Sequence, residues 1–164
     1  SQFKILKSAS TQLIANDAME YFLLISDNTV ADSAQVALKK FARGDYLMYQ
    51  NRNDLALAQF AKILTENKGD EIEAVTLLRM GKINEKQGDF TEALRLYKQI
   101  IDLHPDGIYV DEALYFSAEI YDQQLKQPEL AKPLFEKMII EHQESIYFID
   151  ARRKFREIRG DNNL

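Results

Sequence analysis

The chain of 164 residues contains no cysteine. It therefore forms no disulfide, has no thiolate nucleophile and offers no Cys ligand to a metal. No run approaches the roughly 18 consecutive apolar residues from which a membrane-spanning helix is predicted. Glycine and proline are scarce, with six and three residues, so little room is left for long irregular loops.

Positive charge is also in the minority, and the net charge at pH 7 is -5. This argues against nucleic acid as the main partner, because phosphate contacts need clustered Lys and Arg. A basic cluster does occur near the end of the chain. We interpret it as the solvated face of a helix, with an anion-binding site as the alternative. Its members are Arg152, Arg153, Lys154, Arg156 and Arg159.

Motifs for catalysis are missing: the sequence has no His-Glu-x-x-His, no Gly-rich phosphate loop and no nucleophile elbow. Its two histidines, His104 and His142, occupy the same position of two successive repeats, which favours a role in a turn between repeats. We therefore expect no enzyme, and no catalytic, cofactor or metal site. Carboxylate pairs fall at two helix starts, where they favour the positive end of the helix dipole: Glu71 with Glu73, and Asp111 with Glu112.

What the sequence does contain is one short pattern, written four times. In the clearest copy, Ala93, Tyr97 and Ile100 follow the spacing i, i+4, i+7 of one helical stripe. The alanines of successive copies recur at a nearly constant period, which is typical of stacked helical repeats. The other copies are Ala18, Phe22, Ile25; Ala56, Phe60, Ile63; and Ala131, Phe135, Met138.

Apolar periodicity and capping residues predict a chain of helices with no strands. Glycine ends two of them, at Gly69 and Gly88, and Pro133 is expected in about the first turn of its helix, where a missing N–H does least harm. The fold class predicted is all-α: a right-handed α-solenoid of antiparallel helix pairs with a C-terminal capping helix. The predicted helices are 2–14, 18–28, 33–50, 55–65, 71–87, 91–103, 109–125, 129–141 and 146–159.

The first helix of each pair carries a small residue that we call the notch. The aromatic residue of the second helix is expected to pack there, so the notch must be small. Three pairs have both members: Gly44 with Phe60, Gly81 with Tyr97, and Ala118 with Phe135.

These positions resemble the tetratricopeptide repeat, in which a notched helix is followed by a Gly-Asp turn, an Ala…Tyr/Phe helix and a proline. The resemblance is strong for residues 71–105, good for 108–142 and degenerate for 1–28 and 33–67. The chain departs from the family pattern in its period of 37 to 38 rather than about 34, and in lacking proline after the other pairs. The best copy carries Leu77, Gly81, Gly88, Asp89, Phe90, Ala93, Tyr97 and Pro105.

The longer period, with a linking segment from His104 to Ala113, resembles the repeats of bacterial cell-envelope proteins of the BamD and YbgF type. The resemblance implies a non-catalytic repeat domain that binds other proteins. It also implies a periplasmic or envelope-associated location, with the cytoplasm as the alternative.

We expect a single repeat domain over 1–164, with repeats at 1–30, 31–69, 70–107 and 108–144 and a capping helix at 145–160. The chain begins at Ser1, inside what reads as a repeat, so we expect it to be part of a longer protein.

The function predicted is a scaffold that binds a peptide or protein segment on the concave face formed by the first helices. For any one residue the alternative is a core position or a solvated charge. Two other functions stay open: a structural spacer or self-association module, and a docking arm for an enzyme elsewhere in the parent chain. The candidate residues lie one turn either side of each notch: Phe41, Asp45, Tyr49, Leu78, Lys82, Glu85, Tyr115, Glu119 and Asp122.

Overall fold

The structure is a computed structural model and describes residues 32–161. All regular secondary structure within this range is helical, which confirms the all-α prediction. The predicted helices 2–14 and 18–28, with the first copy of the pattern and the repeat at 1–30, lie outside the described residues. The helices are α2 (Asp32–Tyr49), α3 (Asn53–Glu66), α4 (Glu71–Gln87), α5 (Phe90–Leu103), α6 (Val110–Glu119), α7 (Pro128–Glu141) and α8 (Phe148–Arg159), with a π-helical turn η1 (Ile120–Gln124) directly after α6.

The helix ends follow the sequence signals closely. Gly88 ends α4 with φ +81°, and the N–H groups of Gly88 and Asp89 donate to the carbonyls of Glu85 and Asn84. Glycine adopts this left-handed conformation without a steric penalty, so the turn between α4 and α5 can be short. The Asp89 side chain then caps α5 by accepting from the Glu92 N–H.

The chain divides into two compact units between Ile63 and Leu64, and each is described by itself. Unit 1 holds α2 and most of α3, and unit 2 holds α4 to α8. The prediction that residues 1–164 form one domain stays a prediction.

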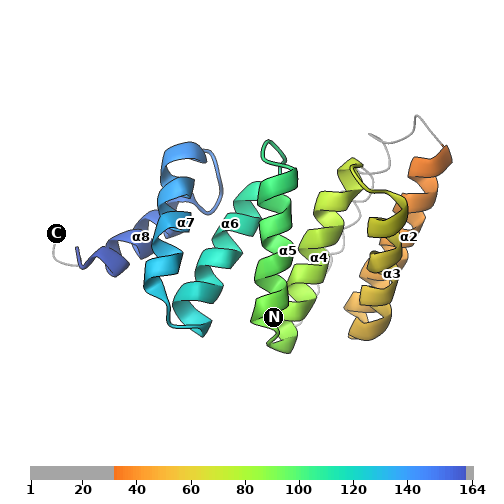
Figure 1. The fold of residues 1–164 in the computed structure, drawn as a ribbon, viewed down its shortest axis with the longest axis horizontal. Helices are drawn as coiled ribbons and strands as arrows, with labels where there is room; N and C mark the ends of the chain where they lie inside the picture. The colour runs from red at the N-terminus through yellow and green to blue at the C-terminus, as the bar shows by residue number, and fades with distance from the viewer. Residues whose placement is uncertain (1–31, 162–164) are drawn as a thin grey trace, which may run out of the picture. The chain divides into compact units, whose positions relative to one another are not determined.

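Within unit 2, helices that are neighbours in sequence pack side by side (Figure 1). The pairs α4–α5 and α6–α7 are joined because α5 packs on α6, and α7 in turn packs on α8. The stripe of α5, Ala93, Tyr97 and Ile100, is fully buried. A helix pair of this size cannot cover such a stripe alone, so stacking with the next pair completes the core. The arrangement is that of a tetratricopeptide-like helical solenoid.

The notch residues lie under the aromatic rings predicted for them. In unit 1, a β-carbon on Gly44 would stand 2.8 Å from Cδ1 of Phe60. In unit 2, the ring of Tyr97 occupies the same place over Gly81. These approaches require a residue without a side chain, which confirms the predicted role of both glycines.

The π-helical turn accounts for an irregularity in the repeat length. The separation from notch to following alanine is the same in two repeats, Gly44 to Ala56 and Gly81 to Ala93. From Ala118 to Ala131 it is longer by a single residue. The extra residue lies in η1, where the Leu125 N–H donates to the Ile120 carbonyl. A π turn is the usual way for a helix to absorb one inserted residue.

One detail of the predicted helices was wrong. Because α7 begins at Pro128, Pro133 is its sixth residue and lies inside the helix, beyond the first turn. The proline at the start of α7 is Pro128 itself, which suits the first helical position because its missing N–H has no partner there.

Both histidines follow the last residue of a second helix. Nε2 of His104 lies 3.2 Å from Oε2 of Glu73, in the first turn of α4. Nδ1 of His142 lies 2.6 Å from Oδ1 of Asp111, in the first turn of α6. Each imidazole thus links the C-terminal end of the second helix to a carboxylate at the N-terminal end of the first helix in the same pair.

Candidate partner-binding surface

In unit 2 the first helices, α4, α6 and α8, are linked to one another by side chains. We call these side chains the A-helix ladder. They combine half-exposed aromatic rings with charged groups, the mixture typical of a protein-binding surface. The members are Lys82, Glu112, Tyr115, Phe116, Glu119, Asp122, Tyr147, Asp150 and Lys154.

Three aromatic rings form the centre of the ladder. Tyr115 and Tyr147 stack with ring centroids 4.5 Å apart and planes 19° from parallel. Phe116 meets both rings edge-on, with its centroid 5.8 Å from each. Aromatic pairs in these geometries contribute about 0.5–1.5 kcal/mol beyond the burial of area. The cluster therefore fixes the start of α8 against α6.

The two tyrosine hydroxyls donate to carboxylates of the opposite helix. The Tyr115 hydroxyl donates to Asp150 of α8, and the Tyr147 hydroxyl donates to Oε1 of Glu112 of α6, at 3.2 Å. Burial, followed by the charge of Glu112, raises the pKa of Tyr147 to about 12. Burial and the hydrogen bond to Asp150 likewise raise the pKa of Tyr115. Both phenols therefore stay protonated donors at neutral pH.

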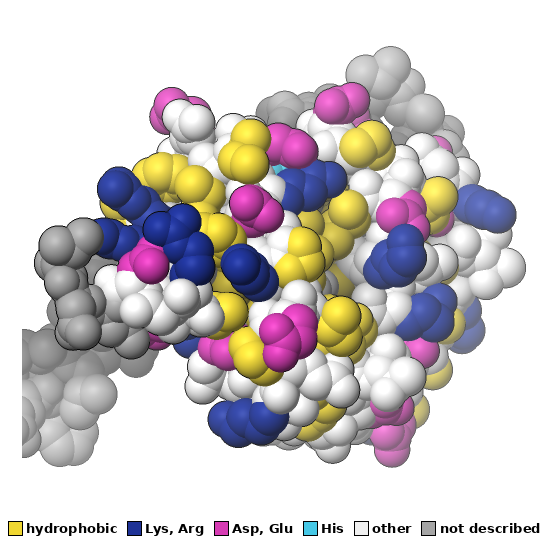
Figure 2. Space-filling view, turned by 60° about the vertical axis from the view of Figure 1, so that its left-hand side comes forward, with side chains coloured by type: hydrophobic (Ala, Val, Ile, Leu, Met, Phe, Trp, Pro, Cys, Tyr) yellow, Lys and Arg dark blue, Asp and Glu magenta, His cyan; other side chains and the backbone are white. Residues whose placement is uncertain are grey.

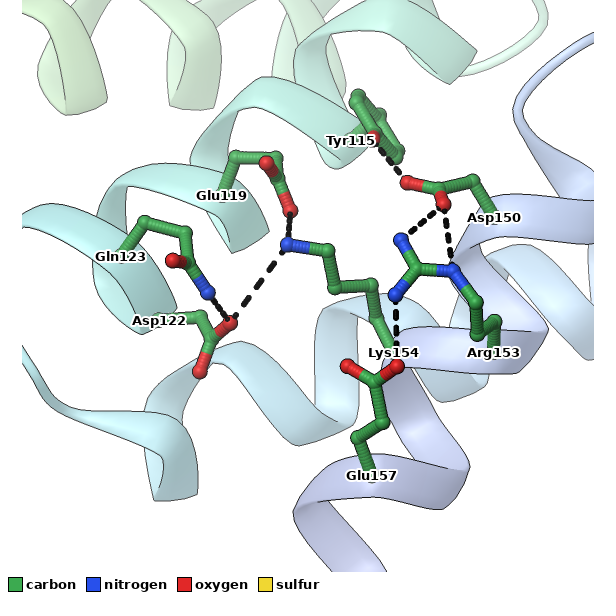
Figure 3. A network of polar contacts seen from close by, with 8 residues as sticks. All are labelled: Tyr115, Glu119, Asp122, Gln123, Asp150, Arg153, Lys154 and Glu157. Atoms are coloured by element: carbon green, nitrogen blue, oxygen red, sulfur yellow. Dashed lines mark hydrogen bonds and ion pairs between the residues drawn. The ribbon is translucent and has the colours of Figure 1, made fainter. Parts of the chain in front are cut away.

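Two lysines complete the ladder from either end. Lys82 of α4 places Nζ 3.5 Å from Oε1 of Glu112 and 4.9 Å from the centroid of the Phe116 ring. Lys154 of α8 places Nζ 2.8 Å from Oε1 of Glu119 and 3.9 Å from Oδ2 of Asp122 (Figure 3). Both ammonium groups thus join two neighbouring first helices.

Asp150 is the most connected carboxylate of the ladder. It accepts from Tyr115 and from the guanidinium of Arg153, which also donates to Oε1 of Glu157 at 2.6 Å (Figure 3). Burial opposes ionisation of Asp150, but these two donors outweigh it and lower its pKa. The carboxylate is therefore charged throughout the physiological pH range.

The predicted site residues divide into three groups. Phe41 in unit 1 and Leu78 in unit 2 are 1% and 0% exposed, so their side chains lie in the core and offer no surface to a partner. In unit 1, Tyr49 is 80% exposed and Asp45 is half-buried. The remaining five are half-buried residues of unit 2: Lys82, Glu85, Tyr115, Glu119 and Asp122.

Those five share a feature that the sequence alone did not reveal: each side chain makes a hydrogen bond or an ion pair with another residue of the chain. Four belong to the ladder, and Glu85 accepts a hydrogen bond of 2.9 Å from the Tyr97 hydroxyl. Burial, then the charge of Glu85, raises the pKa of Tyr97, so this hydroxyl also remains a donor. The surface is therefore pre-organised, because its side chains are held in place before any partner arrives.

Five ladder residues were absent from the sequence prediction. A signal for two of them was present, since the segment 146–151 repeats the pattern of 108–113, which places Asp150 in register with Glu112. The pairing itself depends on how α8 is rotated against α6, and no periodicity in the sequence reports that. The five are Glu112, Phe116, Tyr147, Asp150 and Lys154.

The described residues bring no three His, Asp or Glu side chains together in a way that could hold a metal ion. Of the helices in this part of the chain, none combines the length and apolar character that crossing a membrane requires.

A family model of the tetratricopeptide repeat matches residues 76–107, which run from Thr76 in α4 to the turn after α5. This match and the helical architecture support a tetratricopeptide-type repeat protein. Repeats of this family generally mediate protein–protein interaction and typically serve as non-catalytic scaffolds. No curated protein matches the chain.

Proposed function

We propose that this chain is a protein-interaction scaffold whose unit 2 binds a peptide or protein segment along the A-helix ladder. The single observation that best supports this is the aromatic cluster of Tyr115, Phe116 and Tyr147. It lies half-exposed on the first helices and is flanked by charges. Anchors of this kind dominate the binding energy of protein interfaces.

The charges of the ladder favour a partner segment with basic residues. Four ladder carboxylates outnumber the three cations paired with them, Lys82, Lys154 and Arg153. The carboxylates belong to Glu112, Glu119, Asp122 and Asp150. A Lys or Arg of the partner can share one of these carboxylates, while an aromatic or aliphatic side chain of the partner covers the rings. Unit 1 offers a separate aromatic side chain in Tyr49, which is 80% exposed.

Selection of peptides from a random displayed library tests the proposal. The whole chain serves as bait, and the affinity of the enriched peptide is measured by calorimetry. Tyr115→Ala should weaken binding about tenfold or more, as truncation of an anchor does. Lys82→Ala should weaken it as well, because Lys82 holds Glu112 and the Phe116 ring in place. Tyr49→Ala reports independently on unit 1.

The matched controls are Arg95→Ala and Lys98→Ala on α5. Both side chains are exposed and paired with charges of their own helix. They should leave the affinity unchanged. Equal affinity for parent, Lys82→Ala and Tyr115→Ala would contradict the proposed surface. A mass that rises with concentration in light scattering would instead favour the self-association module.

We propose further that this protein works in the bacterial cell envelope. The support is the resemblance of the linking segment 104–113 to repeats of envelope proteins. Fractionation of cells that carry the tagged full-length protein tests this location. Recovery in the soluble cytoplasmic fraction alone would contradict it.

A further inference from the structure

We infer that the outward side of α8 is a docking surface for an acidic amphipathic helix of a partner protein. We call this side the outer α8 face. It lies on the side of α8 away from Ala151, through which α8 is buried. It meets the A-helix ladder at Arg153, which donates to Asp150. Its members recur at helical spacing: Ile149, Arg152, Arg153, Arg156 and Arg159.

The spacing of the repeats shows which residue of α8 falls at the notch position. The separation from the alanine of a second helix to the next notch is the same in two cases, Ala56 to Gly81 and Ala93 to Ala118. The residue at the same separation after Ala131 is Arg156. A long basic side chain therefore stands where the earlier first helices have a notch for an aromatic ring.

On α6 the same face is covered by a helix. Leu114 and Ala118 of α6 are fully buried, and α7 packs against that helix. The corresponding residues of α8 are Arg152 and Arg156, both exposed. No helix within the described residues lies on them. The outer α8 face thus corresponds to the side of α6 that a second helix covers. On α8 the residues of that side are basic rather than apolar.

The charges of this face are only partly satisfied. Arg153 pairs with Asp150 and Glu157, and Arg159 pairs with Asp161. Across the range 32–161, neither the Arg152 nor the Arg156 guanidinium has an ion-pair or hydrogen-bond partner, although the Arg156 carbonyl accepts from the Asp161 N–H. Figure 2, which brings the α8 end of unit 2 forward, shows Lys and Arg side chains gathered there.

These features fit one occupant best. Arg156 fills the space that a notch would leave for an aromatic ring. A carboxylate of the partner can instead accept two N–H groups of the Arg156 guanidinium. Ile149 is 73% exposed and offers an apolar contact at the edge of the basic row. A helix that presents Glu or Asp toward the arginines and an apolar residue toward Ile149 complements both.

A synthetic peptide tests this docking surface directly. The probe has the sequence of α7, residues 128–141, because α7 covers the equivalent face of α6. Two of its buried positions are changed, Phe135→Glu and Met138→Glu. Fluorescence anisotropy should show saturable binding of the labelled probe to the whole chain, weakened when salt is raised from about 50 mM to about 300 mM.

Charge reversal supplies the decisive comparison. The double variant Arg152→Glu with Arg156→Glu should bind the probe at least tenfold more weakly. It should regain binding when the probe carries Lys at both changed positions. The control, Lys62→Glu with Lys68→Glu, makes the same change in net charge at exposed residues of α3 and the next turn, and should bind like the parent.

Each other result overturns the inference. Equal binding by the double variant removes the arginines from the site. Failure of the parent chain to bind the probe at low salt leaves the outer α8 face as solvated surface. Binding to vesicles of anionic phospholipid, but not to the probe, assigns the face to a membrane surface instead. The double variant should fold like the parent chain, because both arginines are exposed and their reversal removes no core contact.

Discussion

The ring of Tyr97 covers the α-carbon of Gly81 so closely that a β-carbon there would lie 2.8 Å from Cδ1 of the ring. No real β-carbon tolerates that distance, so one partner has to move. Tyr97 is 0% exposed, and its hydroxyl donates to Glu85 on the same helix as Gly81. The ring is therefore fixed at both ends, and the close approach defines how α4 and α5 pack.

Gly81→Ala should lower the free energy of unfolding by about 1–2 kcal/mol, because overpacking outweighs the better helix propensity of alanine. In a Tyr97→Ala background the same change should instead raise the stability by about 0.5–1 kcal/mol, since the clash is gone. Urea denaturation of the four proteins measures both effects. The same sign in both backgrounds would mean that the ring does not set the size of the notch.

Ala93→Leu is expected to cost about 1–3 kcal/mol, because Ala93 is 0% exposed and added volume has no space. The matched control is Ala42→Leu on the exposed side of α2, which should change the stability by about 0.5 kcal/mol or less. Thermal melts followed by circular dichroism compare the two. Identical melting of parent and Ala93→Leu would mean that the stripe does not lie in the core.

Deleting Gln124 should be tolerated, because it restores the spacing between notch and alanine that the other repeats have. The π turn η1 would then become regular α-helix, with a change of about 1 kcal/mol or less. Deleting Lys86 from α4 shortens a spacing that is already regular and should cost several times more. The midpoints of urea denaturation compare the stability of the two deletion variants with that of the parent chain. A Gln124 deletion as damaging as the Lys86 deletion would contradict the insertion account.

High pH should weaken the joint between α6 and α8. The pKa of Tyr147 is about 12 in the folded protein, against about 10 in an unfolded chain. Its contribution to stability is therefore fully present below about pH 10 and is lost as the pH rises through about 12. Unfolding free energies between about pH 9 and 12 should fall less steeply in Tyr147→Phe than in the parent. If the free energy of unfolding fell equally steeply with pH in both proteins, ionisation of Tyr147 would not contribute to the loss of stability.

The repeating stripe and the notches predicted most of the fold. A helix end is determined by residues at that end, such as a glycine in the left-handed conformation or a capping Asp. These residues can be recognised in the sequence, and α4 therefore has the predicted bounds. The π turn was visible only as one additional residue between Ala118 and Ala131. Without coordinates that residue could have belonged to the turn after the helix rather than to the helix itself.

The candidate site was harder to predict than the fold. Counting one turn from each notch found Lys82 and Tyr115, but it also selected Leu78, which is fully buried. The count assumes that every first helix turns the same side outward. The partners of Lys82 and Tyr115, Glu112 and Asp150, come from the next first helix along the stack, and only packing brings them together.

Hydrogen–deuterium exchange of the whole chain with its selected peptide is the most direct measurement of the central claim. Binding on the A-helix ladder predicts that the peptide slows exchange in α4, α6 and the start of α8, with α5 and α7 unchanged. The same protection should be absent in Tyr115→Ala. Protection confined to α5 and α7, or unaltered by Tyr115→Ala, would contradict a partner site on the first helices.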